Sequence, residues 1–445
     1  MGEPGDTDNQ PNANELSPKS LAAFAISPIC LLIGAMLLLG LILRVYAFGF
    51  PDSFMFDEHH FVENARNYLH HQPDWNDHPP LGKLFIALSI RAFGDNSVGW
   101  RVPALVLGLV TILCGGLAAA RMFKSKHAGW IAAAFLSVDG FHIAYSRAAL
   151  LDGYLAAFLA MALFVATFPL NFASALAAGF VLGIAASVKF SGITVLLPLT
   201  VAALFAPVTK RKLFACTGLV GVVAAVVYFA QYACGLSLAG KAASPIDVVN
   251  DTQRLIDHHA ALTDMKNPWV SGWITWGVPT RPALLSYARH WGEVRVLSGM
   301  GNIALWWPGV ALTVILVGVI IAKGVLFVAA SPNEQTTQSN SVSVVAFLRQ
   351  HGRAELVLLA GCIGFIAPWV VSHRDSYIYH FLPAYTAIIV TLSGYVAWVR
   401  KHKPIDALLF IGLVLVVAAF YAPIWSSMAT SEAAVNARLF LRGWR

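Results

Sequence analysis

The sequence contains few charged residues and few cysteines. Only 12% of its 445 residues are Asp, Glu, Lys or Arg, whereas 58% are hydrophobic, a balance that excludes ordinary water-soluble folds. The net charge is +7, but no run of five or more Lys or Arg occurs, so we expect no nucleic-acid partner. The five cysteines show no CxxC spacing and lie in or beside apolar segments, which predicts neither a disulfide nor a zinc site.

The apolar residues form about eleven segments, most of them close to the ~20 residues that a membrane-spanning helix needs. These segments cover residues 27–48, 98–123, 129–145, 149–168, 173–188, 190–207, 213–235, 302–322, 355–372, 377–399 and 405–422. The pattern predicts an all-α polytopic membrane protein, with amphipathic helices in the loop that follows the first segment. No soluble domain and no internal repeat typical of two-fold transporters is visible.

The distribution of Lys and Arg predicts the orientation in the membrane. When eleven spans are threaded, the short basic loops at 121–126, 210–212 and 400–403 fall on one side, which the positive-inside rule assigns to the cytoplasm. The predicted N-terminal half is a disordered cytoplasmic tail (1–24) and helices one to seven (25–235), which include an extracytoplasmic loop (49–97). A second extracytoplasmic loop follows (236–301). The predicted C-terminal part is helices eight to eleven (302–424), which include a cytoplasmic linker (323–354), and an extracytoplasmic tail (425–445). Both long extracytoplasmic loops are rich in His, Trp, Asp and Arg, so we expect the chemistry there.

Asp57 and Glu58 follow the first apolar segment, and residues 77–83 precede a segment that is amphipathic enough to lie on the membrane surface. Transfer of a sugar from a lipid phosphate requires a base that removes the proton of the acceptor hydroxyl. A carboxylate just outside the lipid region suits this task, which makes Asp57 the candidate base. The alternative is that the acidic pair only caps a surface helix, and an isolated pair favours that alternative.

Several basic residues stand at the extracytoplasmic ends of apolar segments, where fixed cations could stabilise a departing lipid phosphate without a metal. These candidates are Arg101, Arg147, Lys189 and Arg374. The alternatives are that they extend to lipid headgroups or pair with Asp139 or Asp152. The two carboxylates flank Arg147 in the sequence, so this short turn either shapes the donor site or forms an internal salt bridge.

Histidine and tryptophan are frequent in the two long loops. Neighbouring histidines such as His258 and His259 point to different faces of a helix, and no pair has the i, i+4 spacing with a carboxylate that would make a metal site convincing. We therefore expect no metal and no other cofactor. Trp276 and the other tryptophans of the second loop either stack on a sugar or acceptor or belong to an interfacial aromatic belt.

Taken together, several strings resemble the protein O-mannosyltransferase family. They are FDEHHF (56–61), HPPLGK (78–83), GWRVPAL (99–105), SRAALLD (146–152), SVKFSG (187–192), PWVSGWITWGVPTRP (268–282), NIALWWPG (302–309) and YIYHFLP (377–383). The resemblance covers nearly the whole chain in the right order. It implies a C-type glycosyltransferase fold with eleven spans and inverting transfer of mannose from a dolichyl or polyprenyl phosphate to Ser or Thr hydroxyls.

The resemblance also implies roles for individual residues. Asp57 would be the base, Glu58 would position the acceptor, and Arg101 would lie near the donor phosphate. The remaining predicted donor or acceptor residues are His78, Lys83, Asp139, Asp152, Trp276, Arg281, Tyr379 and His380.

The large soluble insert of eukaryotic members is missing between helices seven and eight, which is typical of a bacterial inner-membrane member acting in the periplasm. Alternative acceptors are lipid A, a polysaccharide or another glycolipid. A sugar-lipid transporter or flippase is a further alternative, which the grouping of polar residues on one face disfavours.

Overall fold

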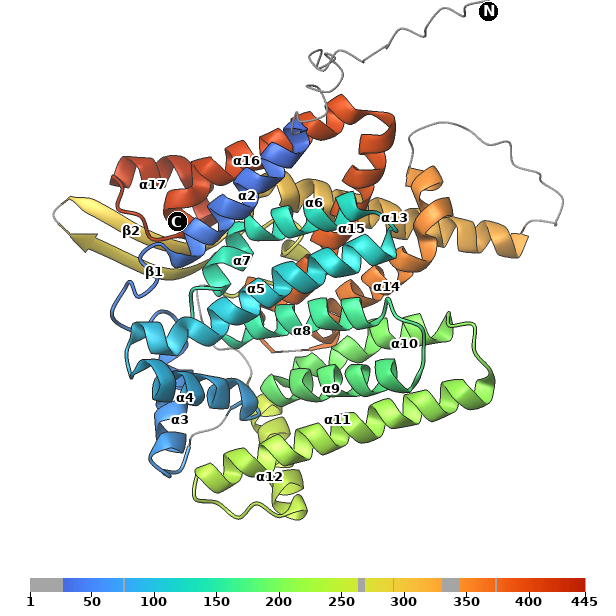
Figure 1. Cartoon of the computed structure of the whole chain (residues 1–445). Helices are drawn as coiled ribbons and strands as arrows, with labels where there is room; N and C mark the ends of the chain where they lie inside the picture. The colour runs from blue at the N-terminus through green and yellow to red at the C-terminus, as the bar shows by residue number, and fades with distance from the viewer. Residues whose placement is uncertain are drawn as a thin grey trace, which may run out of the picture.

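The computed structural model describes residues 27–74, 77–262, 269–290, 292–329, 344–372 and 374–444. The tail predicted to be disordered, residues 1–24, lies outside these ranges. Most of the described chain is helical, and many of its long helices run side by side in similar directions (Figure 1). This agrees with the predicted helical membrane protein.

Seven helices are long and apolar enough to cross a membrane. They are α2 (Pro28–Val45), α5 (Ser97–Met122), α11 (Lys210–Leu238), α13 (Ile303–Ala329), α14 (Val344–Val371), α15 (Leu382–His402) and α16 (Pro404–Trp425). Shorter apolar helices are α8 (Leu151–Val165), α9 (Phe172–Val188) and α10 (Leu196–Leu204), the last preceded by the 3-10 helix η1 (Phe190–Val195). The protein therefore spans the membrane several times. Each of the eleven predicted segments contains helix, but eleven as the number of spans stays a prediction.

The predicted third segment consists of two helices, α6 (Lys126–Ser137) and α7 (Gly140–Tyr145). Asp139 separates them because its side chain accepts a hydrogen bond from the backbone N–H of His142 and so begins a new helix. The predicted linker at 323–354 also differs from the structure, since α13 continues to Ala329 and α14 already begins at Val344.

Short elements occupy the two long loops that are predicted to be extracytoplasmic. The first loop contains α3 (Glu58–Leu69) and α4 (Leu81–Phe93), which confirms its predicted helices. The second contains α12 (Pro245–Ala261), the 3-10 helix η2 (Trp273–Thr275) and an antiparallel hairpin of β1 (Ala283–His290) and β2 (Glu293–Gly299), and α17 (Glu432–Arg438) and η4 (Arg442–Trp444) follow α16. The hairpin was not predicted, although the alternation of buried Val294 and Val296 with Arg295 is a strand pattern.

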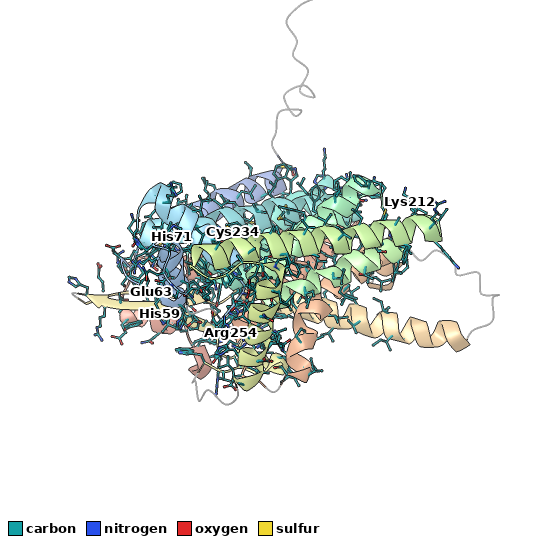
Figure 2. The ribbon with its side chains drawn as sticks, turned by 90° about the horizontal axis from the view of Figure 1, so that it is seen from below. His59, Glu63, His71, Lys212, Cys234 and Arg254 are labelled. Atoms are coloured by element: carbon teal, nitrogen blue, oxygen red, sulfur yellow. The ribbon has the colours of Figure 1, made fainter. Side chains whose placement is uncertain are left out.

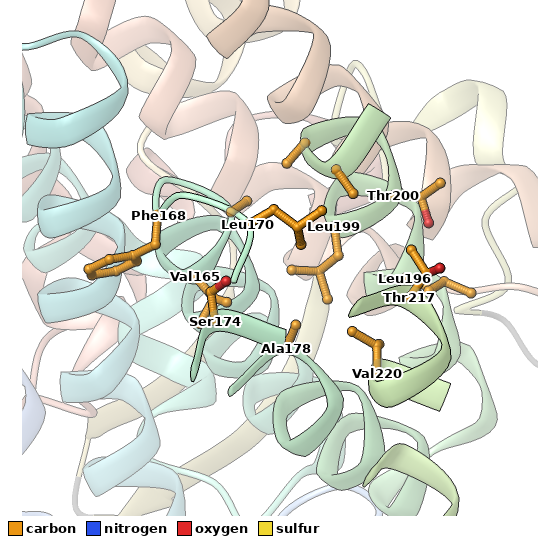
Figure 3. A pocket seen from close by; sticks show the side chains of 13 residues that line it. Val165, Phe168, Leu170, Ser174, Ala178, Leu196, Leu199, Thr200, Thr217 and Val220 are labelled. Carbon is orange, nitrogen blue, oxygen red and sulfur yellow. The ribbon is translucent and has the colours of Figure 1, made fainter. Parts of the chain in front are cut away.

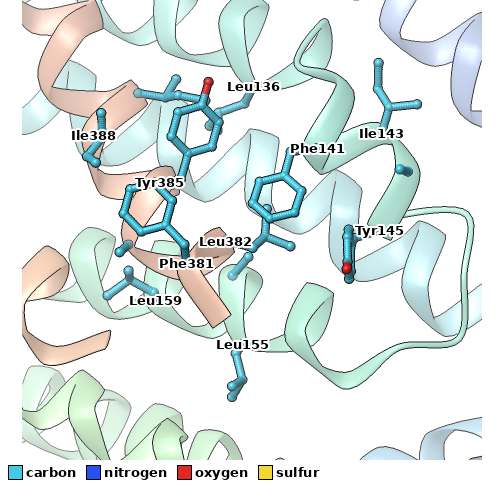
Figure 4. Close-up of a cluster of buried hydrophobic side chains, with 14 of the residues drawn as sticks. Leu136, Phe141, Ile143, Tyr145, Leu155, Leu159, Phe381, Leu382, Tyr385 and Ile388 are labelled. Carbon is cyan, nitrogen blue, oxygen red and sulfur yellow. The ribbon is translucent and has the colours of Figure 1, made fainter. Parts of the chain in front are cut away.

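The packed centre of the molecule surrounds α15, which contacts α5, α6, α8, α13, α14 and α16. Figure 4 shows part of this core, in which Phe141 of α7 lies between Tyr145 and Tyr385, and Tyr385 lies beside Phe381. Small residues permit close helix contacts elsewhere, because a side chain at Gly179 or Gly183 of α9 would collide with α11. Most of α11 is exposed on its other side, as expected of a helix that faces lipid.

The polar loops gather at one end of the helices. In Figure 2, Lys212 lies at the opposite end of α11 from Cys234, whereas His59, Glu63, His71 and Arg254 lie toward the Cys234 end. Two of the basic loops also meet, since Lys124 and Lys401 both lie close enough to His351 to act on it electrostatically.

Candidate active site

One cavity at the polar end brings together seven of the predicted site residues. It encloses about 520 Å³ of empty space, part of which is open to solvent. The predicted residues that line it are Asp57, His78, Asp152, Lys189, Arg374, Tyr379 and His380. Six further lining residues were not predicted from the sequence, namely Phe56, His60, Phe61, Asp77, Tyr145 and Leu150. Four of these lie inside the strings FDEHHF and SRAALLD, and the other two directly precede HPPLGK and SRAALLD, so membership in or adjacency to these strings is the signal that could have identified them.

Asp57 occupies the first position before α3, yet its side chain makes no capping hydrogen bond. The carboxylate instead lines the cavity, half-buried, and accepts no hydrogen bond from the described part of the protein. Burial raises the pKa of Asp57 above its usual range, although His60 and Lys189 act in the opposite direction. A carboxylate that lacks a protein partner and has a raised pKa is suited to accept a proton from a bound ligand.

Glu58, in contrast, is fully buried and does not reach the cavity. Its two oxygens accept hydrogen bonds from Nε and Nη2 of Arg101, both at 2.9 Å, and from the backbone N–H groups of Met55 and Ala149. The remaining Arg101 amino group donates to the carbonyl of Pro51. Glu58 and Arg101 therefore fix the loop that carries Asp57, and this geometry does not place Arg101 at a donor phosphate.

Lys189 lies between α9 and η1, and its ammonium contacts both oxygens of Asp152 at 3.0 Å. This is one of the pairings considered from the sequence. The pair lines the cavity, and the Lys189 nitrogen also lies 5.5 Å from the centre of the Tyr379 ring. An ammonium has three N–H donors, so one remains for a ligand after two bond to Asp152.

Arg374 reaches the cavity from the segment before α15. Its guanidinium donates a hydrogen bond of 2.7 Å to Nδ1 of His259 on α12. Because a guanidinium cannot accept, His259 must be neutral and carry its proton on Nε2. Burial and the nearby Arg374 lower the pKa of His259 to about 4, which agrees with the neutral form. His259 therefore orients Arg374, a role the sequence did not reveal.

The loop before α4 contributes Asp77 and His78. Lys83 is fully buried and donates to the backbone carbonyl of His78 at 2.6 Å, which holds the loop in place. Burial lowers the pKa of Lys83 to about 8 and that of His78 well below its usual range. Oδ1 of Asp77 and Nδ1 of His78 are buried without a hydrogen-bond partner in the described residues, so both are available to a polar ligand.

Aromatic side chains close the cavity toward α15. Tyr379 and His380 line it, and the His380 ring stacks on Trp369 with centroids 3.7 Å apart. Trp276 packs behind His380 and donates to the carbonyl of Ser271 at 3.0 Å. Since only 1% of Trp276 is exposed, it belongs to the packed core in this structure and contacts neither a ligand site nor the lipid boundary.

Two predicted residues have structural roles outside the cavity. Arg147 donates to the carbonyls of Leu43, Arg44, Tyr46, Ala47 and Ser426, which satisfies the end of α2. Asp139 accepts hydrogen bonds from His142, Tyr385 and the backbone of Asn302. The three-residue convergence of Asp139, Arg147 and Asp152 considered from the sequence does not occur, because each binds a different partner.

Two other cavities lack this chemistry. Arg281 donates to the carbonyl of Val270 and lines a cavity of about 820 Å³ that shares no residue with the one described above. A third cavity, between α8, α9, α10 and α11, has an empty volume of about 600 Å³ and no ionisable lining residue (Figure 3). No group of three or more potential metal-ligating residues occurs within the described ranges.

Two family models match consecutive parts of the chain. "Dolichyl-phosphate-mannose-protein mannosyltransferase" matches residues 34–238, and "C-terminal four TMM region of protein-O-mannosyltransferase" matches residues 247–444. A polyprenol-phosphate-mannose–protein mannosyltransferase of Mycobacterium tuberculosis is 24% identical, over 88% of this chain and 86% of its own. A dolichyl-phosphate-mannose–protein mannosyltransferase 1 of Saccharomyces cerevisiae is 29% identical over 37% of this chain and 23% of its own.

Solved structures show the same fold. The S. cerevisiae protein O-mannosyltransferase complex Pmt1-Pmt2, bound to the sugar donor, matches with a TM-score of 0.76 at 14% identity, over 94% of this chain and 93% of the other. ArnT of Cupriavidus metallidurans matches with a TM-score of 0.59 at 12% identity, over 93% and 68%. The fold is therefore that of the membrane glycosyltransferases, and the chain belongs to the protein O-mannosyltransferase family.

Proposed function

We propose that this protein transfers mannose from a polyprenyl phosphate to Ser or Thr hydroxyls of proteins, with inversion at the sugar carbon. The names of the relatives support the donor and the acceptor. One observation carries the mechanism: the cavity contains the carboxylate of Asp57, which accepts no hydrogen bond from the residues that the structure describes, together with two cations, Lys189 and Arg374. This combination provides a proton acceptor and a phosphate site in one space.

In the proposed reaction, Asp57 takes the proton of the acceptor hydroxyl as its oxygen attacks C1 of the sugar. The new bond forms on the face of C1 opposite the phosphate, and the bond between C1 and the phosphate oxygen breaks. The bonding electrons leave with the polyprenyl phosphate. The raised pKa of Asp57 suits this step, because a stronger base accepts the proton more readily.

Lys189 and Arg374 stabilise the charge that develops on the leaving phosphate. Both are held by protein partners, Lys189 by Asp152 and Arg374 by His259, so little reorganisation is required during the reaction. Each retains N–H groups beyond those used in these contacts. Asp77 and His78 offer their unpartnered polar atoms to the hydroxyls of the sugar.

The location follows the same reasoning. The cavity lies at the end of the helices that carries the polar loops, and Lys212 lies at the other end (Figure 2). We place the basic end in the cytoplasm, which puts the N-terminus there as well and turns the cavity toward the periplasm of a bacterial inner membrane. In this arrangement the cavity and Asp57 are accessible to secreted and envelope proteins.

The test is transfer of labelled mannose from polyprenyl phosphate to a Thr-containing peptide by the purified protein. Asp57→Asn should reduce the rate by ~10² to 10⁴, the usual contribution of a general base, while donor binding persists. Asp52→Asn is the matched control, because Asp52 lies in the same loop but bonds to Ser97 and does not line the cavity.

Full activity of Asp57→Asn would remove the base from the mechanism. Labelling of lipid A, polysaccharide or another glycolipid in place of the peptide would reassign the acceptor. Movement of the sugar lipid across proteoliposomes without any product would support a flippase.

A further inference from the structure

The hairpin of β1 and β2 has one protected edge and one open edge. It projects from the polar end of the molecule, with β2 nearer α17 and β1 on the opposite side of the hairpin (Figure 1). β2 packs against α7, α16 and α17, whereas the most extensive contact of β1 is with β2. An edge strand presents backbone N–H and C=O groups that can pair with another polypeptide.

The pairing register shows which residues of β1 face outward. Val294 of β2 exchanges two backbone hydrogen bonds with Thr430, so it faces away from β1. Its partner across the hairpin is Arg289, which by the alternation of antiparallel pairs faces away from β2. Tyr287, two residues earlier, faces the same way. Neither Arg289 nor Tyr287 has a backbone hydrogen-bond partner on this edge within the described residues.

The base of the hairpin adjoins the cavity. Gly299 pairs with Ala283 at the start of β1, and a side-chain carbon at Gly299 would lie 3.0 Å from the ring of Tyr145, which lines the cavity. Tyr287 is four residues farther along β1, or about 13 Å at ~3.3 Å per residue. An extended polypeptide of roughly four to six residues therefore spans the distance from the open edge to the cavity.

We propose that the outer edge of β1 binds an extended segment of the acceptor polypeptide as an added strand, at Tyr287 and Arg289, and so presents a nearby Ser or Thr to the cavity. This rests on the proposed function, in which the acceptor is a protein. Outward N–H and C=O groups on every second residue have the regular spacing of the complementary groups on an extended peptide backbone, which is the basis of strand addition. Because backbone groups make the contact, it tolerates many acceptor sequences.

The test compares Tyr287→Pro with Tyr287→Ala. Proline at position 287 lacks the outward N–H, but it leaves the hydrogen bonds between β1 and β2 intact, and proline is tolerated at a strand edge. Alanine keeps the outward N–H. For a long Thr peptide, Tyr287→Pro should raise the acceptor KM by about three- to tenfold, the effect of one lost peptide hydrogen bond. Tyr287→Ala should stay close to wild type, and a Thr tripeptide should be used equally well by all three proteins.

A second measurement does not depend on a variant that folds. Long acceptor peptides with a single N-methylated amide, scanned along the chain, should lose activity at alternate positions four to six residues from the Thr. Equal effects on long and short peptides, or no effect of either change, would overturn the docking site. A change of oligomeric state in Tyr287→Pro would assign the edge to a second copy of the chain. Transfer by the wild type to glycolipid but to no peptide would overturn the proposed function itself.

Discussion

Replacement of Glu58 by Gln should mainly lower the stability of the protein, with little direct effect on the transfer reaction. The Glu58 carboxylate accepts four hydrogen bonds, two from Arg101 and two from the backbone of Met55 and Ala149, and both charged side chains are fully buried. Gln keeps one oxygen but removes the charge that offsets Arg101. Breaking one side of a buried ion pair typically costs ~3–5 kcal/mol, so we expect a loss of this size in unfolding free energy.

The measurement is denaturant unfolding of the purified protein together with its transfer rate. Arg101→Gln should be similarly destabilised, and the double variant should lose less than the sum of the two, because the charges are removed together. Asp57→Asn serves as the opposite control, with wild-type stability and little transfer. If Glu58→Gln abolished transfer at unchanged stability, Glu58 would act on the acceptor directly and our structural assignment would be refuted.

Two further predictions concern the cavity. Asp57 acts when deprotonated, and burial raises its pKa above the ordinary value of 3.8. The value of kcat/KM should therefore fall as the pH decreases, with a midpoint above 3.8. A midpoint at or below 3.8 in the pH profile would contradict the assignment of Asp57 as the base. His259→Phe cannot accept the hydrogen bond from Arg374, so this variant should raise the donor KM by about tenfold. His259→Gln, whose amide oxygen can accept that hydrogen bond, should have a donor KM close to that of the wild type. Equal donor KM values for the two variants would rule out the role of His259 in orienting Arg374.

Local features of the sequence predicted much of the fold and part of the site. Runs of apolar residues identified the membrane helices, because the hydrophobic length of a helix depends only on its own residues. Asp57 and Lys189 were predicted from their positions at the ends of apolar segments, and His78 belongs to one of the family-like strings; the structure places all three around one cavity. The hairpin was missed because its strands mix buried and exposed residues and so form no continuous apolar run, and because its contact with Thr430 lies far along the chain.

The sequence by itself determined that the chain is a membrane protein, with short basic loops on one side and two long polar loops on the other. Only the tertiary structure decided which charge meets which partner. Arg101 and Arg147 looked equivalent to Lys189 in the sequence, yet Arg101 binds Glu58 across 43 residues and Arg147 binds carbonyls at the end of α2. The reason is that a buried charge needs partners within hydrogen-bonding distance, and the fold decides which groups lie at that distance. The local sequence does not determine these distances.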